Sequence, residues 1–165
     1  MEQTKERTHG LVRSAIVIAL YIAITVLLGP LGNGAIQFRL SEMFNYLALK
    51  NKRYIWALTV AVAVSNYIMP NSLGVVDVVV GSLSTLIFVS LGRYVTRNIK
   101  NETKRFFFFN LFFSFSMFTI AGELHYMLDL PFFLTWLTCG LGEFISLLIG
   151  GWVIQQIGKR VDLTK

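Results

Sequence analysis

The chain has 165 residues, of which 55% are hydrophobic and 15% are charged, with a formal net charge of +6. A soluble domain of this length carries about 25% charged residues, so the composition excludes a water-facing globular protein. Charge-free stretches occur at Ser14–Phe38, Tyr54–Val76, Val78–Gly92 and Phe106–Gly122. Since about 20 apolar residues cross a bilayer as a helix, we predict an all-α integral membrane protein with one embedded domain, residues 1–165.

Six transmembrane helices are expected along the chain. Their predicted ranges are Leu11–Gly29, Ala35–Leu49, Tyr54–Met69, Val75–Arg93, Phe106–Leu128 and Pro131–Ile157. The step Gly29-Pro30 and the turn Gly32-Asn33-Gly34 are expected to end the first span, and the second span is expected to be short and amphipathic. Pro131 suits the first turn of the last helix. Residues 1–10 form a polar amino-terminal segment and residues 158–165 a polar tail.

The basic residues define a predicted orientation. Fourteen of the fifteen Lys and Arg residues lie at one side of the predicted spans: in the amino-terminal region through Arg13, between the second and third spans, from Arg93 at the end of the fourth span to the fifth, or in the tail. Because short cytoplasmic loops retain basic residues, both termini are expected in the cytoplasm. Facing anionic lipid headgroups explains this positive charge, so it does not indicate nucleic-acid binding. The exception is Arg39, which begins the second span on the opposite side.

Small residues recur at helical spacing in three spans. They are Ala15, Ala19 and Ala23; Ala57, Ala61 and Ser65; and Cys139, Gly142, Ser146 and Gly150. Such stripes let helices approach closely in lipid, and internal packing is the simpler interpretation of any one of them. Because six short helices can hardly bury all three stripes, we interpret the first as a surface that docks against a partner protein.

Polar side chains inside the spans are the candidate binding residues, because such groups are costly in lipid. They are Gln37, Arg39, Glu42, Asn66, Asp77, Glu123, His125 and Glu143. Arg39 and Glu42 are three residues apart and close enough to pair, either as a structural brace or within a binding site. The other acids lack an obvious cation, so they are either protonated or meet a cationic or donor-rich ligand. For His125 an interfacial hydrogen bond is expected rather than a metal.

Glu143 is the most informative of these residues, because it lies near mid-depth, about 18 Å along the last span. It shares a helix stripe with Trp136 and Gly140. An aromatic ring at Trp136, the space left by Gly140 and the carboxylate of Glu143 suit a planar heterocycle that presents N–H donors. The carboxylate would accept two N–H bonds while the indole stacks on the ring. A protonated Glu143 bonded to a neighbouring helix is the alternative.

The sequence has no phosphate-binding loop, no H-E-x-x-H or paired-cysteine motif and no G-x-S-x-G motif. These are the local patterns that indicate ATP hydrolysis, metal binding or serine-hydrolase chemistry. We therefore do not expect an enzyme, and we expect no cofactor in this chain.

Two stretches carry a resemblance to a known family: residues 34–42, Gly-Ala-Ile-Gln-Phe-Arg-Leu-Ser-Glu, and residues 77–85, Asp-Val-Val-Val-Gly-Ser-Leu-Ser-Thr. They resemble the QueT family, substrate-binding S components of energy-coupling factor (ECF) transporters assigned to queuosine precursors, which are deazaguanine bases. The resemblance implies a six-helix cup with its pocket near the extracellular side of a prokaryotic cell membrane. It also implies a membrane-embedded coupling subunit and two cytoplasmic ATPases as partners, which would use the ATP. The alanine face of the first helix is the usual docking surface, which Ala15, Ala19 and Ala23 match.

The resemblance gives the candidate residues expected roles. Glu143 would accept N–H groups of the base, and Asp77 or Glu123 would meet an aminomethyl cation. Gln37, Arg39 and Asn66 would orient the base or close the pocket. Trp136 or Tyr126 would stack on the base. Two alternatives remain at this point: an S component for another vitamin or heterocycle, and a stand-alone proton-coupled carrier that uses Glu123 and Glu143 as relays.

Overall fold

The computed structural model describes residues 2–32, 39–70, 72–160 and 162, and within these ranges it is helical and contains no strand. The elements are α1 (Glu2–Gly32), the 3-10 helix η1 (Leu40–Phe44), α2 (Asn45–Lys50), α3 (Arg53–Ile68), α4 (Val75–Thr96), α5 (Glu102–Phe115), α6 (Phe118–Leu128) and α7 (Phe132–Gly158). The predicted all-α class is confirmed. Stretches long and apolar enough to cross a membrane are Glu6–Gly29, Val75–Thr96, Glu102–Leu128 and Phe132–Gly158.

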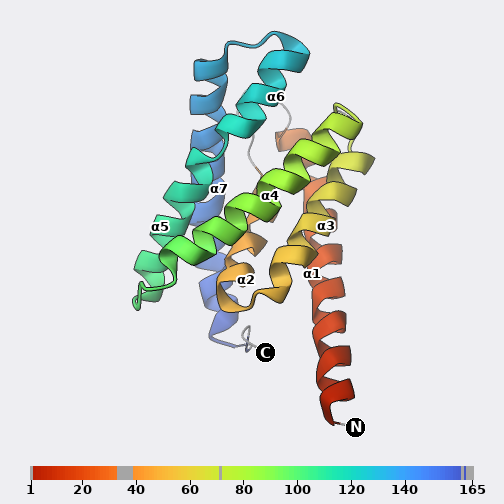
Figure 1. The fold of residues 1–165 in the computed structure, drawn as a ribbon, viewed down its shortest axis with the longest axis vertical. Coiled ribbons are helices and arrows are strands. Elements are labelled where there is room, and N and C mark those ends of the chain that lie inside the picture. The colour runs from red at the N-terminus through yellow and green to blue at the C-terminus, as the bar shows by residue number, and fades with distance from the viewer. Residues whose placement is uncertain (1, 33–38, 71, 161, 163–165) are drawn as a thin grey trace.

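The connections that carry the basic residues gather at one end of the bundle, which we call the basic end. The amino-terminal end of α1, the α2–α3 and α4–α5 connections and the carboxy-terminal end of α7 all lie there (Figure 1). The α3–α4 and α6–α7 connections lie at the opposite end (Figure 1). This arrangement agrees with the grouping of the basic residues in the sequence.

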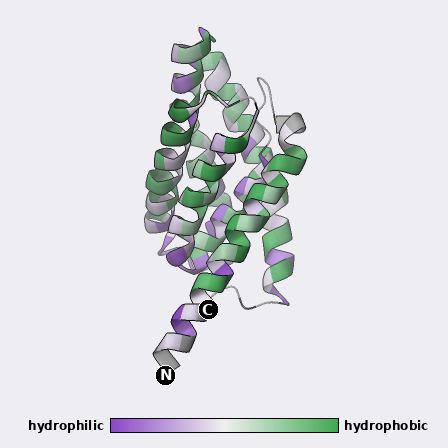
Figure 2. Cartoon of the chain, turned by 90° about the vertical axis from the view of Figure 1, so that its right-hand side faces the viewer, coloured by the Kyte–Doolittle hydropathy of each residue, from purple (hydrophilic) through white to green (hydrophobic). Residues whose placement is uncertain are grey.

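The outer surface of the bundle is suited to lipid. Hydrophobic residues dominate the helices along most of its length (Figure 2). Leu27 and Phe133 are each 77% exposed, and Trp56 is 66% exposed. Large apolar side chains exposed on several helices are unfavourable in water and favourable in a bilayer, so the surface supports the predicted membrane location.

The helices surround the short η1–α2 segment. Helix α1 packs on α3 and η1, α3 packs on α4, α4 packs on α5 and α6, and both of these pack on α7, which returns to η1. Every residue from Ser41 to Leu49 is buried. Gly150 of α7 makes this approach possible, because a Cβ there would overlap the Cβ of Met43. Tyr46 adds a hydrogen bond from its hydroxyl to the Leu147 carbonyl at 3.0 Å.

The predicted second span, Ala35–Leu49, is wrong in its described part. Residues 35–38 lie outside the described residues, and the rest forms η1 and the six-residue α2 instead of one amphipathic helix. Together η1 and α2 rise about 19 Å, which is less than the hydrocarbon thickness of about 30 Å. Such irregular backbone is tolerated at membrane depth only where protein covers it, as it does here.

The first and fifth predicted spans end at the same residues as the apolar stretches Glu6–Gly29 and Glu102–Leu128, and the helices differ from the predictions in two details. Helix α1 continues through Gly29-Pro30 to Gly32, since a proline removes one backbone donor without having to end a membrane helix. The predicted fifth span is broken into α5 and α6 at Ser116 and Met117. At this break the Ser116 hydroxyl donates to the Phe113 carbonyl at 2.6 Å, replacing part of the interrupted backbone ladder.

Candidate functional site

The structure brings together ionisable side chains from four separate parts of the chain. Arg39, which precedes η1, lies within electrostatic range of Glu42, Asp77 and Glu143. Glu123 of α6 lies within range of Asp77 and Arg39. We call these five residues the carboxyl cluster. Among the described residues, no ion pair within 4.0 Å joins Arg39 to a carboxylate, and no group of His, Cys, Asp and Glu side chains has the arrangement of a metal site.

Glu42 is held by neutral donors rather than by Arg39. The Tyr21 hydroxyl donates to Oε1 of Glu42 at 2.6 Å, and Nδ2 of Asn45 donates to Oε2 at 2.6 Å. The predicted Arg39–Glu42 brace is therefore wrong. The sequence analysis did not find Tyr21 or Asn45, although Asn45 stands three residues after Glu42, the spacing at which helical neighbours meet. Oδ1 of Asn45 is buried and has no hydrogen-bond partner in the described structure.

Glu143 is buried at 1% exposure, and its Oε1 has no hydrogen-bond partner among the described residues. The polar groups near it on α7 are engaged elsewhere. Ser146 donates to the Gly142 carbonyl of its own helix at 2.9 Å, and the Leu147 carbonyl accepts from Tyr46. A buried polar atom without a partner costs about 1–3 kcal/mol. This carboxyl thus has hydrogen-bonding capacity that the fold itself does not use.

Glu123 has still more unused capacity. Its side chain is 7% exposed, and both carboxyl oxygens are buried without a partner in the described part of the chain. It lies on α6, between the α5–α6 break and the end of the bundle opposite the basic end. Glu123 and Glu143 are the carboxyls of the cluster with unpaired buried oxygens, which is the arrangement that a ligand rich in N–H donors would complete.

Asn66 and Asp77 contact each other across the α3–α4 pair. Nδ2 of Asn66 donates to the Asp77 backbone oxygen at 2.9 Å and lies 3.4 Å from Oδ1 of the same residue. A Cβ on Gly81 would overlap this amide, so Asn66 fits against the bare backbone of α4. This contact fixes the start of α4 and places the Asp77 carboxyl at the cluster.

The two predicted stacking residues lie in different surroundings. Nε1 of Trp136 donates to the Phe115 carbonyl at 3.0 Å, a carbonyl at the α5–α6 break, and its ring packs edge-on against Phe115 and Phe118. Tyr126 is 87% exposed and contacts His125, so the structure does not bring it into the carboxyl cluster. His125 lies 2.7 Å from the Leu130 carbonyl, as expected for an interfacial residue. Gln37 lies outside the described residues.

The three small-residue stripes differ in burial. All members of the stripes on α3 and α7 are buried, so internal packing is confirmed for them. Ala15, Ala19 and Ala23 are exposed along α1. Packing within this chain therefore does not explain the first stripe.

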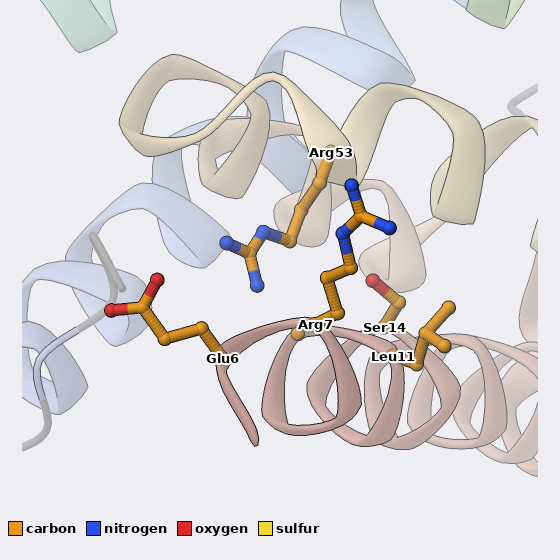
Figure 3. Close-up of a pocket in the computed structure, with 6 residues that line it drawn as sticks. Glu6, Arg7, Leu11, Ser14 and Arg53 are labelled. Atoms are coloured by element: carbon orange, nitrogen blue, oxygen red, sulfur yellow. The ribbon is translucent and has the colours of Figure 1, made fainter. Parts of the chain in front are cut away.

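An open cavity of about 560 Å³ lies at the basic end, between the first turns of α1 and the start of α3 (Figure 3). Its lining residues are Glu6, Arg7, Gly10, Leu11, Ser14 and Arg53. None of them belongs to the carboxyl cluster, so this cavity is a separate feature.

Comparison with known proteins adds the following findings. Residues 11–159 match the family model described as QueT transporter. A protein of Lactococcus lactis subsp. cremoris (strain MG1363), named "Queuosine precursor transporter QueT", is 47% identical to this chain over 170 residues, covering 98% of this chain and 99% of the relative. No solved structure matches the chain.

Proposed function

This chain belongs to the QueT transporter family, a family of membrane transporters and not of enzymes, and from that premise we propose that it is the substrate-binding subunit of an importer for a queuosine precursor, a deazaguanine base. The observation that carries the substrate is the 47% identity, over 98% of the chain, to a relative named for queuosine precursor transport. The carboxyl cluster supplies chemistry that suits such a ligand.

Glu143 is the proposed acceptor for the base. A guanine-like ring presents a ring N–H beside an exocyclic amino group, and one carboxylate can accept from both. Hydrogen bonds to a charged acceptor are roughly twice as strong as neutral ones. The unpaired, buried Oε1 of Glu143 supports this role, because the ligand would satisfy an atom that the fold leaves without a partner.

Glu123 is the proposed partner of an aminomethyl cation on the ligand. Its two carboxyl oxygens are both unpaired, whereas the carboxyl of Asp77, the other candidate, already lies beside Asn66. Arg39, Asn66 and Gln37 would position the base or close the pocket. Trp136 would stack through its ring face, since its N–H is already engaged by Phe115. Stacking by Tyr126 would require it to move toward the cluster.

For the topology we propose six passes through the cell membrane, with both termini in the cytoplasm. The gathering of basic segments at one end of the bundle supports this orientation. The chain leaves the basic end along α1 and returns to it through η1 and α2 before α3 begins. The second pass is therefore the short, protein-covered one.

The proposed partners are an ECF coupling subunit in the membrane and two cytoplasmic ATPases. The exposed Ala15, Ala19 and Ala23 offer a smooth helix face on which another helix can pack closely. The absence of a phosphate-binding loop from the sequence fits a subunit that relies on partners for ATP.

Uptake of a labelled deazaguanine precursor by cells that express this chain, with and without the three partner proteins, tests the proposal. We expect uptake only with the partners, and we expect them to co-purify with the chain in detergent. Transport by this chain alone in liposomes would instead support a proton-coupled carrier built on Glu123 and Glu143. No uptake of the labelled precursor in the presence of the three partners, with uptake of an unrelated labelled vitamin, would contradict the substrate assignment.

A further inference from the structure

Two arginines from different helices line the open cavity at the basic end. The side chain of Arg53 extends from α3 toward α1, and the side chain of Arg7 extends from α1 toward α3 (Figure 3). The Glu6 carboxyl lines the same cavity, on the side toward which the Arg53 guanidinium extends (Figure 3), but no described carboxylate lies within 4.0 Å of either guanidinium. Two cations that face one cavity repel each other unless an anion lies between them.

The position of Arg53 depends on a bare stretch of α1 backbone. Gly10 is buried, and a Cβ at this position would overlap Nη1 of Arg53. The guanidinium therefore rests on the helix where any other residue would displace it. Ser14, one turn further along α1, adds a hydroxyl group to the cavity lining.

The cavity lies at the level where α1 changes from polar to apolar. Arg7 and the residues around it are exposed and polar, whereas Leu11 is 73% exposed and begins the apolar run. In a bilayer such a transition falls in the headgroup region that borders the hydrocarbon core. The lining thus combines two cations with an apolar side chain at the depth of lipid phosphates.

We propose that this cavity is a phosphate-binding site, in which Arg7 and Arg53 are the ligands of a phosphate group. Guanidinium groups match the geometry of phosphate oxygens, and basic pockets on the cytoplasmic side of membrane helices bind anionic headgroups. The phosphate belongs either to an anionic phospholipid or to a soluble phosphate compound. The site is independent of the precursor-binding function proposed for the carboxyl cluster.

Native mass spectrometry of the full, delipidated chain in detergent tests the site. The probes are dioleoyl phosphatidylglycerol, dioleoyl phosphatidylcholine and inorganic phosphate, each also scored by its effect on the unfolding midpoint. We expect the wild type to prefer the anionic over the zwitterionic lipid by about tenfold. If inorganic phosphate raises the unfolding midpoint as much as phosphatidylglycerol does, the site belongs to soluble phosphate compounds. If only phosphatidylglycerol raises the midpoint, the site belongs to lipid.

Matched variants separate this site from general electrostatics. The double variant Arg7→Gln/Arg53→Gln should lose the preference, whereas Arg97→Gln/Arg160→Gln, which removes the same charge from exposed positions, should keep it. Gly10→Ala keeps every charge and should also lose the preference, because it displaces Arg53. This variant covers the case in which the double variant fails to fold. Equal binding by the wild type, both double variants and Gly10→Ala would overturn the proposal.

Discussion

Tyr21 of α1 donates a hydrogen bond of 2.6 Å to Glu42 of η1, and both side chains are buried. The bond ties the first helix to the short segment that the other helices surround. It also occupies the carboxyl that the sequence would pair with Arg39. Neutral donors thus hold Glu42 in place, and no described carboxylate lies within ion-pair distance of the Arg39 guanidinium.

Replacing Tyr21 with Phe should destabilise the protein by about 1–3 kcal/mol, because Oε1 of Glu42 would stay buried without a donor. The unfolding midpoint in detergent measures this effect. Tyr67→Phe is the matched control, since Tyr67 is 77% exposed. Equal midpoints for the two variants would show that the Tyr21–Glu42 bond does not stabilise the fold.

Gly150→Ala should destabilise the fold by about 1–3 kcal/mol, because the added methyl overlaps Met43 of η1 and overpacks the contact. Gly122→Ala makes the same chemical change where the nearest atom is 4.0 Å away. That control should be neutral or slightly stabilising, since alanine favours helices over glycine. Chemical or thermal unfolding of both variants makes the comparison. A Gly150→Ala protein as stable as Gly122→Ala would contradict the proposed packing of η1 on α7.

Glu123→Met should separate stability from binding. The unpaired carboxyl costs the ligand-free fold free energy, so an apolar side chain of similar size should leave stability unchanged or raise it by about 1–3 kcal/mol. Affinity for an aminomethyl deazaguanine should fall at least about tenfold, through loss of the charged partner. Unfolding and binding assays on the same preparation report both quantities. A loss of stability with unchanged affinity would make Glu123 a structural residue.

Ala19→Leu should leave the stability of the isolated chain within about 0.5 kcal/mol, because Ala19 is exposed. Uptake by cells that contain the partner proteins should fall sharply, since the larger side chain would hold the docking helix away. Val60→Leu on α3, at a position that is 47% exposed, is the control and should transport normally. Normal uptake by Ala19→Leu would exclude this stripe as the docking surface.

Hydropathy and charge predicted the features that depend on the free energy of transferring a side chain from water into the membrane. They predicted the all-α class, the grouping of basic segments, and Glu143 as a buried polar residue worth explaining. Each of these depends on the free energy of placing one residue type in lipid or water. Such a cost belongs to the residue itself, so one sequence is enough to read it.

The structural features that the sequence did not predict depend on contacts between residues far apart in the chain. The η1–α2 segment is stabilised by the close approach of Gly150 to Met43 and by the hydrogen bond from Tyr46 to the Leu147 carbonyl. Both partners on α7 lie about 100 positions away, so the local sequence around Leu40 contains neither. The α5–α6 break leaves the Phe115 carbonyl to Trp136 of another helix. The three small-residue stripes look alike in sequence, and only the packing of the helices shows that the one on α1 stays exposed.

The most direct test of the binding site is a calorimetric titration of the purified chain with an aminomethyl deazaguanine. The wild type and Glu102→Gln, a control at an exposed position, should bind one equivalent with the same affinity. Glu143→Gln should bind about tenfold to hundredfold more weakly, because a hydrogen bond to a charged group contributes about 1.5–3 kcal/mol. Identical affinity in all three proteins would contradict the assignment of Glu143 as the acceptor of the base.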